Sequence, residues 1–112
     1  MSKSTEKFYI VAIRHNPQLG SYVYGAHVGT KRMNKRSISS SFDYYGSRKS
    51  IRFSLHADSV FHSHYSFMDD DSVYGSIEYY GFDAREDAKH YLETSFPSKR
   101  GNYAQAMKVL EA

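Results

Sequence analysis

Residues 7–15, KFYIVAIRH, carry β-branched and aromatic side chains on both of their alternating faces. A strand that is apolar on both faces is typical of the middle of a sheet, where other layers cover it from two sides. A turn cluster at residues 16–20 follows, and residues 22–31 then alternate as a partner strand does. The pattern predicts an antiparallel hairpin whose first strand is central.

The second strand of this hairpin contains glycines at alternating positions. Strict alternation places Tyr22, Tyr24, Ala26 and Val28 on one face and Val23, Gly25, His27 and Gly29 on the other. Two glycines on one face are typical of a bulge, or of a second segment packed closely over the backbone. We therefore expect one of these two features here.

The basic residues 31–36 have no apolar period and are predicted to be a loop. Residues 37–45 and 51–56 alternate on either side of the turn sequence GSRKS at 46–50, which favours a second hairpin. In it, Ile38, Ser40, Phe42 and Tyr44 are expected to share one face, and Ile51, Phe53 and Leu55 are expected to point inward. Two more strands are predicted, at residues 60–67 and 73–82.

The C-terminal part changes to a helical period. Asp83, followed three residues later by Glu86, has the pattern of a capping box at a helix start. Pro97 ends this helix, and Asn102 is predicted to cap a second one. The apolar stripes expected to pack in the core are Ala84, Ala88, Tyr91, Leu92 and Phe96 in the first helix and Tyr103, Ala106, Met107 and Leu110 in the second.

Strands first and helices last indicate an α+β chain. We predict an antiparallel sheet of five or six strands followed by two C-terminal helices packed on one face. A length of 112 residues suits one domain, and no repeat, linker or low-complexity tract divides it. Residues 1–112 are therefore expected to form a single α+β domain.

The composition predicts the cellular compartment of the protein better than it predicts the function. Hydrophobic residues make up 40% of the chain and aromatic residues 16%, which is enough for a folded core. Cysteine is absent, so a reducing compartment is expected. The apolar run at residues 8–13 is too short for a signal peptide or a membrane span. We expect a protein of the cytoplasm, of its own cell or of a host cell, with no membrane partner.

The net charge of +3 conceals an asymmetry between the two halves of the chain. Residues 1–55 contain ten Lys or Arg and two acidic residues, whereas residues 56–112 contain five and ten. The first half is expected to attract polyanions or acidic surfaces. Pairing of opposite halves between copies predicts a salt-sensitive homo-oligomer.

The second hairpin is the best candidate for a functional surface. Its cations are interleaved with aromatic residues, in a chain that contains 11 tyrosines among 112 residues. Cations bind phosphates or acidic side chains, while tyrosine supplies contact area at low entropic cost. The residues predicted to contact a partner are Tyr44, Tyr45, Arg48, Lys49 and Arg52, with Lys31, Arg32, Lys35 and Arg36 steering association.

These features predict a non-enzymatic binding module that occupies a protein partner. The chain is small, lacks cysteine and is rich in tyrosine and serine. In that general character it resembles accessory proteins of bacteriophages that disarm host systems for handling nucleic acid. The resemblance implies an accessory or inhibitory role in nucleic-acid handling or host defence. Direct binding of DNA or RNA by the same residues is the alternative, and a charged hairpin tip that only keeps strands from aggregating is also compatible.

A second alternative is a metal-dependent nuclease. His62 and His64 lie two residues apart on a predicted strand, a spacing that directs two rings to one ion. With Tyr91 and Tyr103 on the later helices, the order is similar to that of the His-hydrophobic-His endonucleases of rolling-circle replication. That resemblance implies a metal on the histidines and a nucleophilic tyrosine. Ser63, however, replaces the hydrophobic residue, and neither tyrosine is followed by the lysine of that motif. We expect no metal, no cofactor and no catalytic residue.

Overall fold

The computed structural model describes residues 7–16, 18, 20–34, 37–44, 46–55, 61–68 and 74–112, and only the backbone of residues 34, 44, 55, 61–68 and 74–76. Strands precede helices along this part of the chain. The elements are β1 (Lys7–Asn16), β2 (Gly20–Thr30), β3 (Arg32–Asn34), β4 (Ser37–Tyr44), β5 (Ser47–Leu55), β6 (Phe61–Met68), β7 (Tyr74–Phe82), α1 (Arg85–Ser95) and α2 (Tyr103–Glu111). The predicted α+β class is confirmed.

The strands form one antiparallel sheet in the order β2-β1-β7-β6-β5-β4-β3. β1 lies between β2 and β7, as expected for a strand that is apolar on both faces. The expected count of five or six strands is wrong, because the seventh strand, β3, lies in the segment predicted to be a loop. Its three residues pair with Ser37–Ser39 of β4. Backbone pairing with a neighbour, and not a hydrophobic period, produces this strand.

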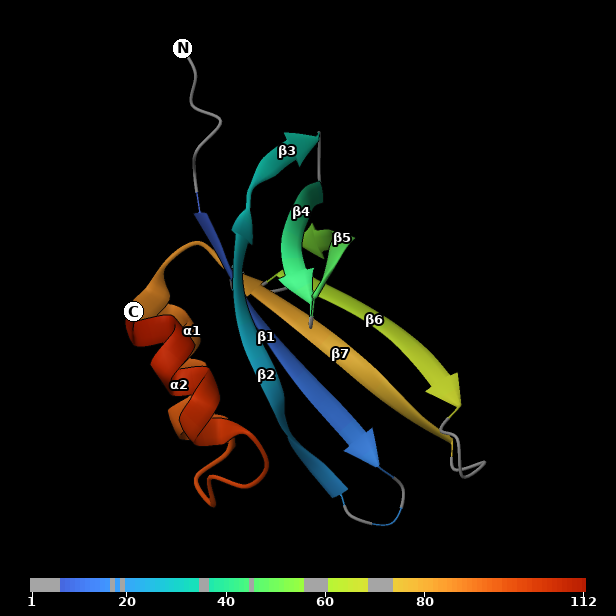
Figure 1. Ribbon diagram of the computed structural model, residues 1–112, viewed down its shortest axis with the longest axis vertical. Helices are drawn as coiled ribbons and strands as arrows, with labels where there is room; N and C mark the ends of the chain where they lie inside the picture. Colours follow the sequence, from blue (N-terminus) through green and yellow to red (C-terminus); the bar gives the residue numbers. More distant parts are fainter. Residues whose placement is uncertain are drawn as a thin grey trace.

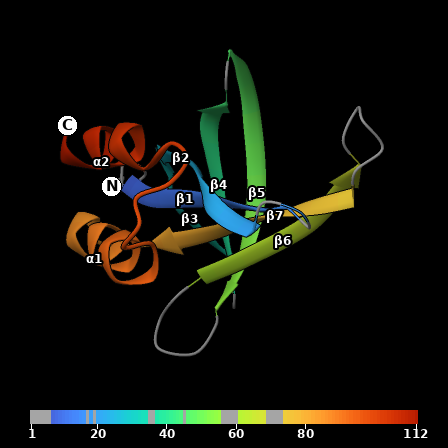
Figure 2. The ribbon, with the colours of Figure 1, turned by 90° about the horizontal axis from the view of Figure 1, so that it is seen from below.

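The sheet bends sharply where β5 meets β6. That ladder contains two residue pairs, Ser54 with His62 and Leu55 with Phe61. Beyond the bend, β4 and β5 cross β1 and β7 at a steep angle (Figure 2). Both helices lie together beside β1 and β2 (Figure 1), on the other side of the central strands. The molecule therefore has three layers: the two helices, the central strands β1, β2 and β7, and the bent-over strands β3, β4 and β5.

Two hydrophobic cores lie on the two faces of the central strands. The helix-side core consists of Val11, Ile13, Val23, Ala26, Phe82, Ala88, Leu92, Tyr103, Ala106 and Leu110. The hairpin-side core consists of Phe8, Ile10, Ala12, Ile38, Phe42, Ile51, Phe53, Ile77 and Tyr79. Successive residues of β1 alternate between the two cores, which is why both of its faces are apolar in the sequence.

β2 departs from strict alternation at a bulge. Its register with β1 shifts between Ala12 and Ile13, where Tyr24 is the extra residue of β2. In consequence Val23 and Ala26 both belong to the helix-side core, while Tyr24 packs against the hairpin-side core. The predicted bulge is confirmed. The faces predicted by strict alternation are wrong for this strand, because the extra residue reverses them.

The second glycine position in β2 is a close crossing of two strands. A Cβ atom at Gly29 would lie 2.6 Å from Ser40 Oγ, 2.7 Å from the Ser41 carbonyl oxygen and 3.1 Å from Phe42 Cβ. β4 therefore passes directly over β2, and the Ser41 N–H donates to Thr30 Oγ1 over 3.1 Å. β2 therefore contains both features that its paired glycines predicted as alternatives, a bulge and a second strand packed closely over the backbone.

β5 begins earlier than the sequence predicts. Residues 46–50 have the composition of a turn, yet Ser47–Ser50 pair with β4 as part of the strand. The turn contracts around Gly46, whose φ is 88°, a backbone conformation that glycine adopts without a steric penalty. The hairpin tip is therefore shorter than predicted, and its charged residues lie along the strand.

The helix starts differ from the predicted caps. Ala84, and not Asp83, is the N-cap of α1, because the Asp83 carboxylate lies 2.7 Å from Lys31 Nζ. Asn102 is the N-cap of α2 as predicted, but its side-chain amide donates to the Tyr24 carbonyl over 2.8 Å and makes no cap bond. Ala84 is exposed, and the other predicted stripe residues pack in the helix-side core. Within the described part of the chain, neither helix has the length and apolar character needed to cross a bilayer.

Candidate functional site

Three arginines of the predicted contact set lie on the outer face of β3, β4 and β5. Ile51 and Phe53 point into the hairpin-side core, so Arg48 and Arg52 alternate to the outside, where both are exposed. Register places Arg52 opposite Ser39, and Ser39 opposite Arg32, in a row across three strands. We call this surface the arginine face and define it as Arg32, Arg48 and Arg52 with Ser39, Ser41 and Ser50.

The other predicted contact residues do not join this face. Lys31 pairs with Asp83 beside α1, and Lys49 lies opposite Phe42, half-buried on the inner side of β5. Of Tyr44 the backbone alone is described, and Lys35, Arg36 and Tyr45 lie outside the described residues. Serines, and not tyrosines, separate the cations whose side chains are described.

The ion pair that Arg48 of the arginine face makes with Asp43 is weak. Arg48 Nη1 lies 3.3 Å from Asp43 Oδ1, and the two side chains are 62% and 85% exposed. An exposed ion pair of this kind contributes at most about 1 kcal/mol. Arg48 can therefore exchange Asp43 for a carboxylate or phosphate of a partner at little cost.

A groove of ≈ 480 Å³ runs along the outer edge of β2, between α2 and the β4–β5 hairpin. It is lined by Lys7, residues 26–30 of β2, Ser41, Phe42, Asp43, Arg48 and Val109 of α2. A smaller hollow of ≈ 210 Å³ shares Ala26, His27, Asp43 and Val109 with it and continues toward Gln105. Arg48 belongs to both the groove and the arginine face, so the two surfaces are continuous.

The groove follows an edge strand whose outer side is covered at two places. Toward the start of β2, the Asn102 N–H donates to the Val23 carbonyl over 2.9 Å. Toward its end, the Ser41 N–H donates to Thr30 Oγ1. Residues 25–28, between these contacts, border the groove. The backbone N–H and C=O groups of an edge strand form a template for an added strand.

Two stacked rings form the floor of the groove. His27 and Phe42 lie with their ring centroids 4.9 Å apart and their planes at 27°. Burial lowers the pKa of His27, because a buried imidazolium loses its hydration. The ring is therefore neutral at neutral pH, and the groove combines an aromatic floor with a charged rim of Lys7, Arg48 and Asp43.

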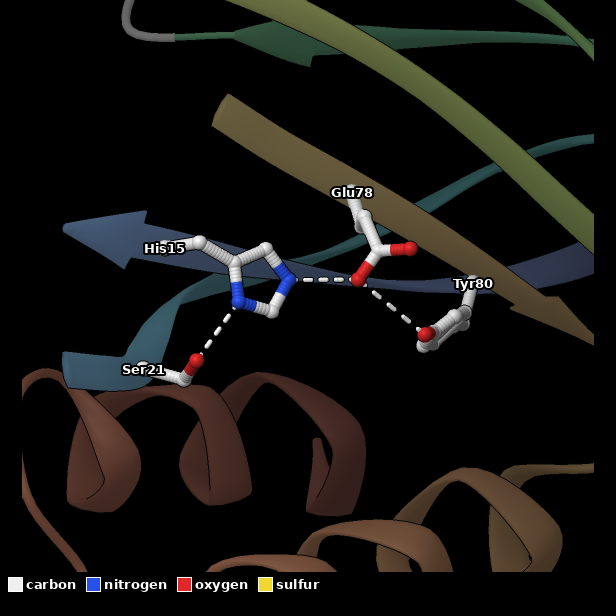
Figure 3. Close-up of polar contacts among 4 residues, drawn as sticks. All are labelled: His15, Ser21, Glu78 and Tyr80. Carbon is white, nitrogen blue, oxygen red and sulfur yellow. Dashed lines mark hydrogen bonds and ion pairs between the residues drawn. The ribbon is translucent and has the colours of Figure 1, made fainter. Parts of the chain in front are cut away.

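A second polar site lies at the opposite end of β2 (Figure 3). His15 on β1 and Ser21 on β2 are directly opposite, with Ser21 Oγ 2.5 Å from His15 Nδ1. His15 Nε2 contacts Oε1 of Glu78 on β7. The Tyr80 hydroxyl donates to the same carboxylate oxygen over 3.2 Å. We call these four residues the histidine relay.

Tyr91 of α1 extends the histidine relay into the helix-side core. Its ring meets Tyr80 edge to face at 5.0 Å, and its hydroxyl is hydrogen-bonded to that of Tyr80. Burial raises the pKa of Tyr91, and the neighbouring Tyr80 and Glu78 raise it further. Burial and the Glu78 charge also raise the pKa of Tyr80. A continuous chain of polar groups thus runs from the half-buried phenol of Tyr91 to the exposed Ser21.

Sequence reasoning did not identify the histidine relay. His15 and Glu78 are 63 residues apart, and only the pairing of β1 with β7 brings them together. A signal was nevertheless present, because Glu78 is the one charged residue within the aromatic-rich stretch 73–82. A carboxylate in such a strand is costly to bury unless it has a partner.

The residues of the nuclease alternative are described in part. His62 and His64 lie on β6, whose side chains are outside the description. Tyr103 is 6% exposed in the helix-side core, and Tyr91 packs against that core. Among the residues whose side chains are described, no group of three or more His, Asp or Glu is placed to hold a metal ion.

Comparison with known proteins finds no matching protein family, no matching curated protein and no matching solved structure.

Proposed function

We propose that this protein is a binding module that holds an extended, acidic segment of a protein partner along the edge of β2. The observation that carries the proposal is the groove beside residues 25–28, where an edge strand borders a hollow between α2 and the β4–β5 hairpin. An extended segment placed there adds a strand to the sheet through main-chain hydrogen bonds, as in β-strand addition.

The chemistry of the groove favours an acidic segment with apolar side chains at alternate positions. On the rim, Lys7 and Arg48 outnumber Asp43, so the local charge is positive. The stacked rings of the floor and Val109 of α2 offer apolar contact. Because successive side chains of a strand point to opposite sides, one row meets the floor while the other faces the rim.

The arginine face complements this role by steering association. Arg32 and Arg52 are exposed on the same sheet face as Arg48, which lines the groove, and exposed cations raise the association rate of an acidic partner. Occupying a segment of the partner is sufficient for an accessory or inhibitory role in nucleic-acid handling or host defence. Binding of this kind needs no chemical step.

The row of Arg32, Ser39 and Arg52 favours a second candidate, direct binding of DNA or RNA. The two arginines lie two strand spacings apart, about 10 Å, on an open polar sheet face. Such cations bind phosphate groups along a nucleic-acid backbone. Because their binding releases counterions from the nucleic acid, the affinity falls as the salt concentration rises. The candidate uses the arginine face without the groove.

Matched charge reversals distinguish the two candidates. Lys7→Glu changes the groove rim, and Arg52→Glu changes the arginine face outside the groove. The ligands are an acidic peptide selected from a random-peptide display library on the wild-type protein, and a labelled single-stranded oligonucleotide of mixed sequence. Fluorescence anisotropy at two salt concentrations measures both affinities.

If the peptide adds a strand to β2, we expect Lys7→Glu to weaken its binding about 10-fold, the equivalent of about 1.4 kcal/mol. Arg52→Glu is expected to change peptide affinity much less. A second pair tests the edge itself: Val28→Glu places a charge at the groove, and Met33→Glu places one at the opposite edge of the sheet. Val28→Glu should weaken the peptide and Met33→Glu should not.

Peptide affinity that is indifferent to both Lys7→Glu and Val28→Glu contradicts the proposal, as does a selection that yields no binding peptide. The second candidate is supported instead if oligonucleotide binding weakens steeply with salt. In Arg52→Glu the slope of log affinity against log salt concentration should then be smaller by about one.

A further inference from the structure

We propose that Ser21 is a nucleophilic serine, activated by His15 and Glu78, that accepts an acyl group from an activated ester or thioester. Ser21 Oγ lies 2.5 Å from His15 Nδ1, and the other ring nitrogen contacts the Glu78 carboxylate (Figure 3). Nucleophile, base and orienting carboxylate in this order of contacts activate serine on unrelated folds. The assignment goes beyond the binding role and uses none of the groove residues.

The hydrogen-bond directions along the histidine relay suit this chemistry. An ionised carboxylate accepts hydrogen bonds and donates none, so Glu78 keeps the ring proton of neutral His15 on Nε2. The lone pair of Nδ1 then faces Ser21, whose hydroxyl donates to it. Tyr80 donates to the same oxygen of Glu78 and holds the carboxylate in place. Tyr80 and Glu78 are positioning residues, and Ser21 and His15 are the groups that act on the acyl donor.

The position of Ser21 provides access for a donor. Ser21 is exposed at the end of the β1–β2 hairpin. Gly20, the residue before it, has a φ of 86°, a backbone conformation that glycine adopts without a steric penalty. An exposed hydroxyl of this kind can be reached by a small carbonyl compound with a good leaving group, and we take this as the donor class.

The chemical step balances within these groups. Ser21 Oγ forms a bond to the carbonyl carbon while its proton passes to His15 Nδ1. The tetrahedral intermediate collapses, the bond from carbon to the leaving oxygen or sulfur breaks, and the leaving group takes the proton from Nδ1. The products are an ester on Ser21, a free alcohol or thiol, and neutral His15, with no oxidant or reductant consumed.

The experiment incubates the folded protein with 4-nitrophenyl acetate and follows acetylation by intact mass spectrometry and peptide mapping. We expect one acetyl group on Ser21, with release of an equal amount of 4-nitrophenolate. Ser21→Ala abolishes the modification, and because Ser21 is exposed this variant is expected to fold. The matched control, Ser54→Ala, removes an exposed serine of β5 and leaves the rate unchanged.

Two further variants separate chemistry from structure. His15→Gln removes the base, and we expect the acetylation rate to fall about 100-fold or more. Glu78→Gln keeps the shape but lets an amide N–H donate to Nε2, which moves the ring proton to Nδ1 and blocks proton acceptance from Ser21. It is expected to lower the rate while circular dichroism remains that of the wild type.

The inference is overturned if acetyl groups appear on lysines but not on Ser21. It is equally overturned if Ser21 is acetylated at the wild-type rate in both His15→Gln and Glu78→Gln. Neither result bears on peptide binding in the groove, because Lys7 and Val28 take no part in the histidine relay. The experiments therefore test the binding role and the reactive serine independently of each other.

Discussion

The two faces of the central strands are covered in different ways, one by the helices α1 and α2 and the other by the bent-over strands β3, β4 and β5. On one face, two helices cover β1, β2 and β7 with apolar stripes that include Leu92 and Leu110. On the other face, the sheet covers itself, because it bends after β6 and brings β4 and β5 back over β1. A covering of strands is one chain thick, so Phe53 faces the core while the neighbouring Arg52 faces solvent. The bend thus produces the arginine face, and the groove lies where the two coverings do not meet.

The largest effect is expected from removing the contact between the bent-over layer and the central strands. Phe53 is fully buried and meets Phe8 edge to face at 5.3 Å. Phe53→Ala should lower the free energy of unfolding by about 3–5 kcal/mol, and the matched Leu92→Ala on the helix side by about 2–5 kcal/mol. Urea denaturation followed by circular dichroism measures both. If the coverings depend on each other, each variant unfolds in one transition; a second transition in Phe53→Ala alone shows that the bent-over layer folds independently.

A smaller loss is expected where the bent-over layer crosses β2. The side chain of Gly29→Ala would meet Ser40 and the Ser41 carbonyl at less than 3 Å, so β4 has to move away. We expect a loss of about 1–3 kcal/mol of unfolding free energy by thermal denaturation. Gly46→Ala is the control: nothing lies within 4 Å of its Cβ position, and only the positive φ costs free energy, about 1 kcal/mol. A Gly29→Ala variant as stable as wild type contradicts the close crossing.

On the helix side, Tyr91 should make the stability fall at alkaline pH. Its pKa is raised in the folded protein, so above about pH 10 the unfolded chain releases a proton that the folded chain keeps. Stability then decreases as pH rises. Tyr91→Phe should cost about 1 kcal/mol at neutral pH through the lost hydrogen bond, and it should flatten the alkaline decrease. Denaturation at a series of pH values from neutral to alkaline measures the slope of unfolding free energy against pH. An equal slope in Tyr91→Phe and wild type contradicts the prediction. Some slope remains in the variant, because the pKa of Tyr80 is also raised.

The smallest effect is expected at the floor of the groove. The pKa of His27 is lowered by burial, so as pH falls below about 6.5 the unfolded chain takes up a proton before the folded chain does. Stability then falls with decreasing pH, by less than about 1.4 kcal/mol per pH unit. His27→Phe keeps a ring against Phe42 and should remove this part of the acid decrease. The exposed His90→Gln is the control, and equal acid slopes in His27→Phe and wild type contradict the assignment.

Much of the local structure could be predicted from the sequence. The strand β1, the β4–β5 hairpin and the stripes of both helices follow from periods of two and 3.6 residues, since each period places one row of side chains in a core. The errors occur where tertiary contacts compete with local preference. Asp83 pairs with Lys31 and leaves the cap of α1, and the glycine-containing β2 reverses its faces at a bulge.

The candidate sites were predictable only in part. The cations of the second hairpin are visible in the sequence, but alternation and register divide them, so Arg52 lies outside while Lys49 lies on the inner side. The groove and the histidine relay join residues that are distant in the chain, such as Val28 with Val109, or His15 with Glu78. No local period carries that information.

The amino-acid pattern was sufficient for both helices, for β1 and for the β4–β5 hairpin, because burial of apolar surface acts on local periods. The tertiary structure alone decided the order of the strands, the bend after β6 and the meeting of Ser21, His15 and Glu78. These depend on which apolar faces pack together and on backbone pairing between distant strands, and both are properties of the whole chain.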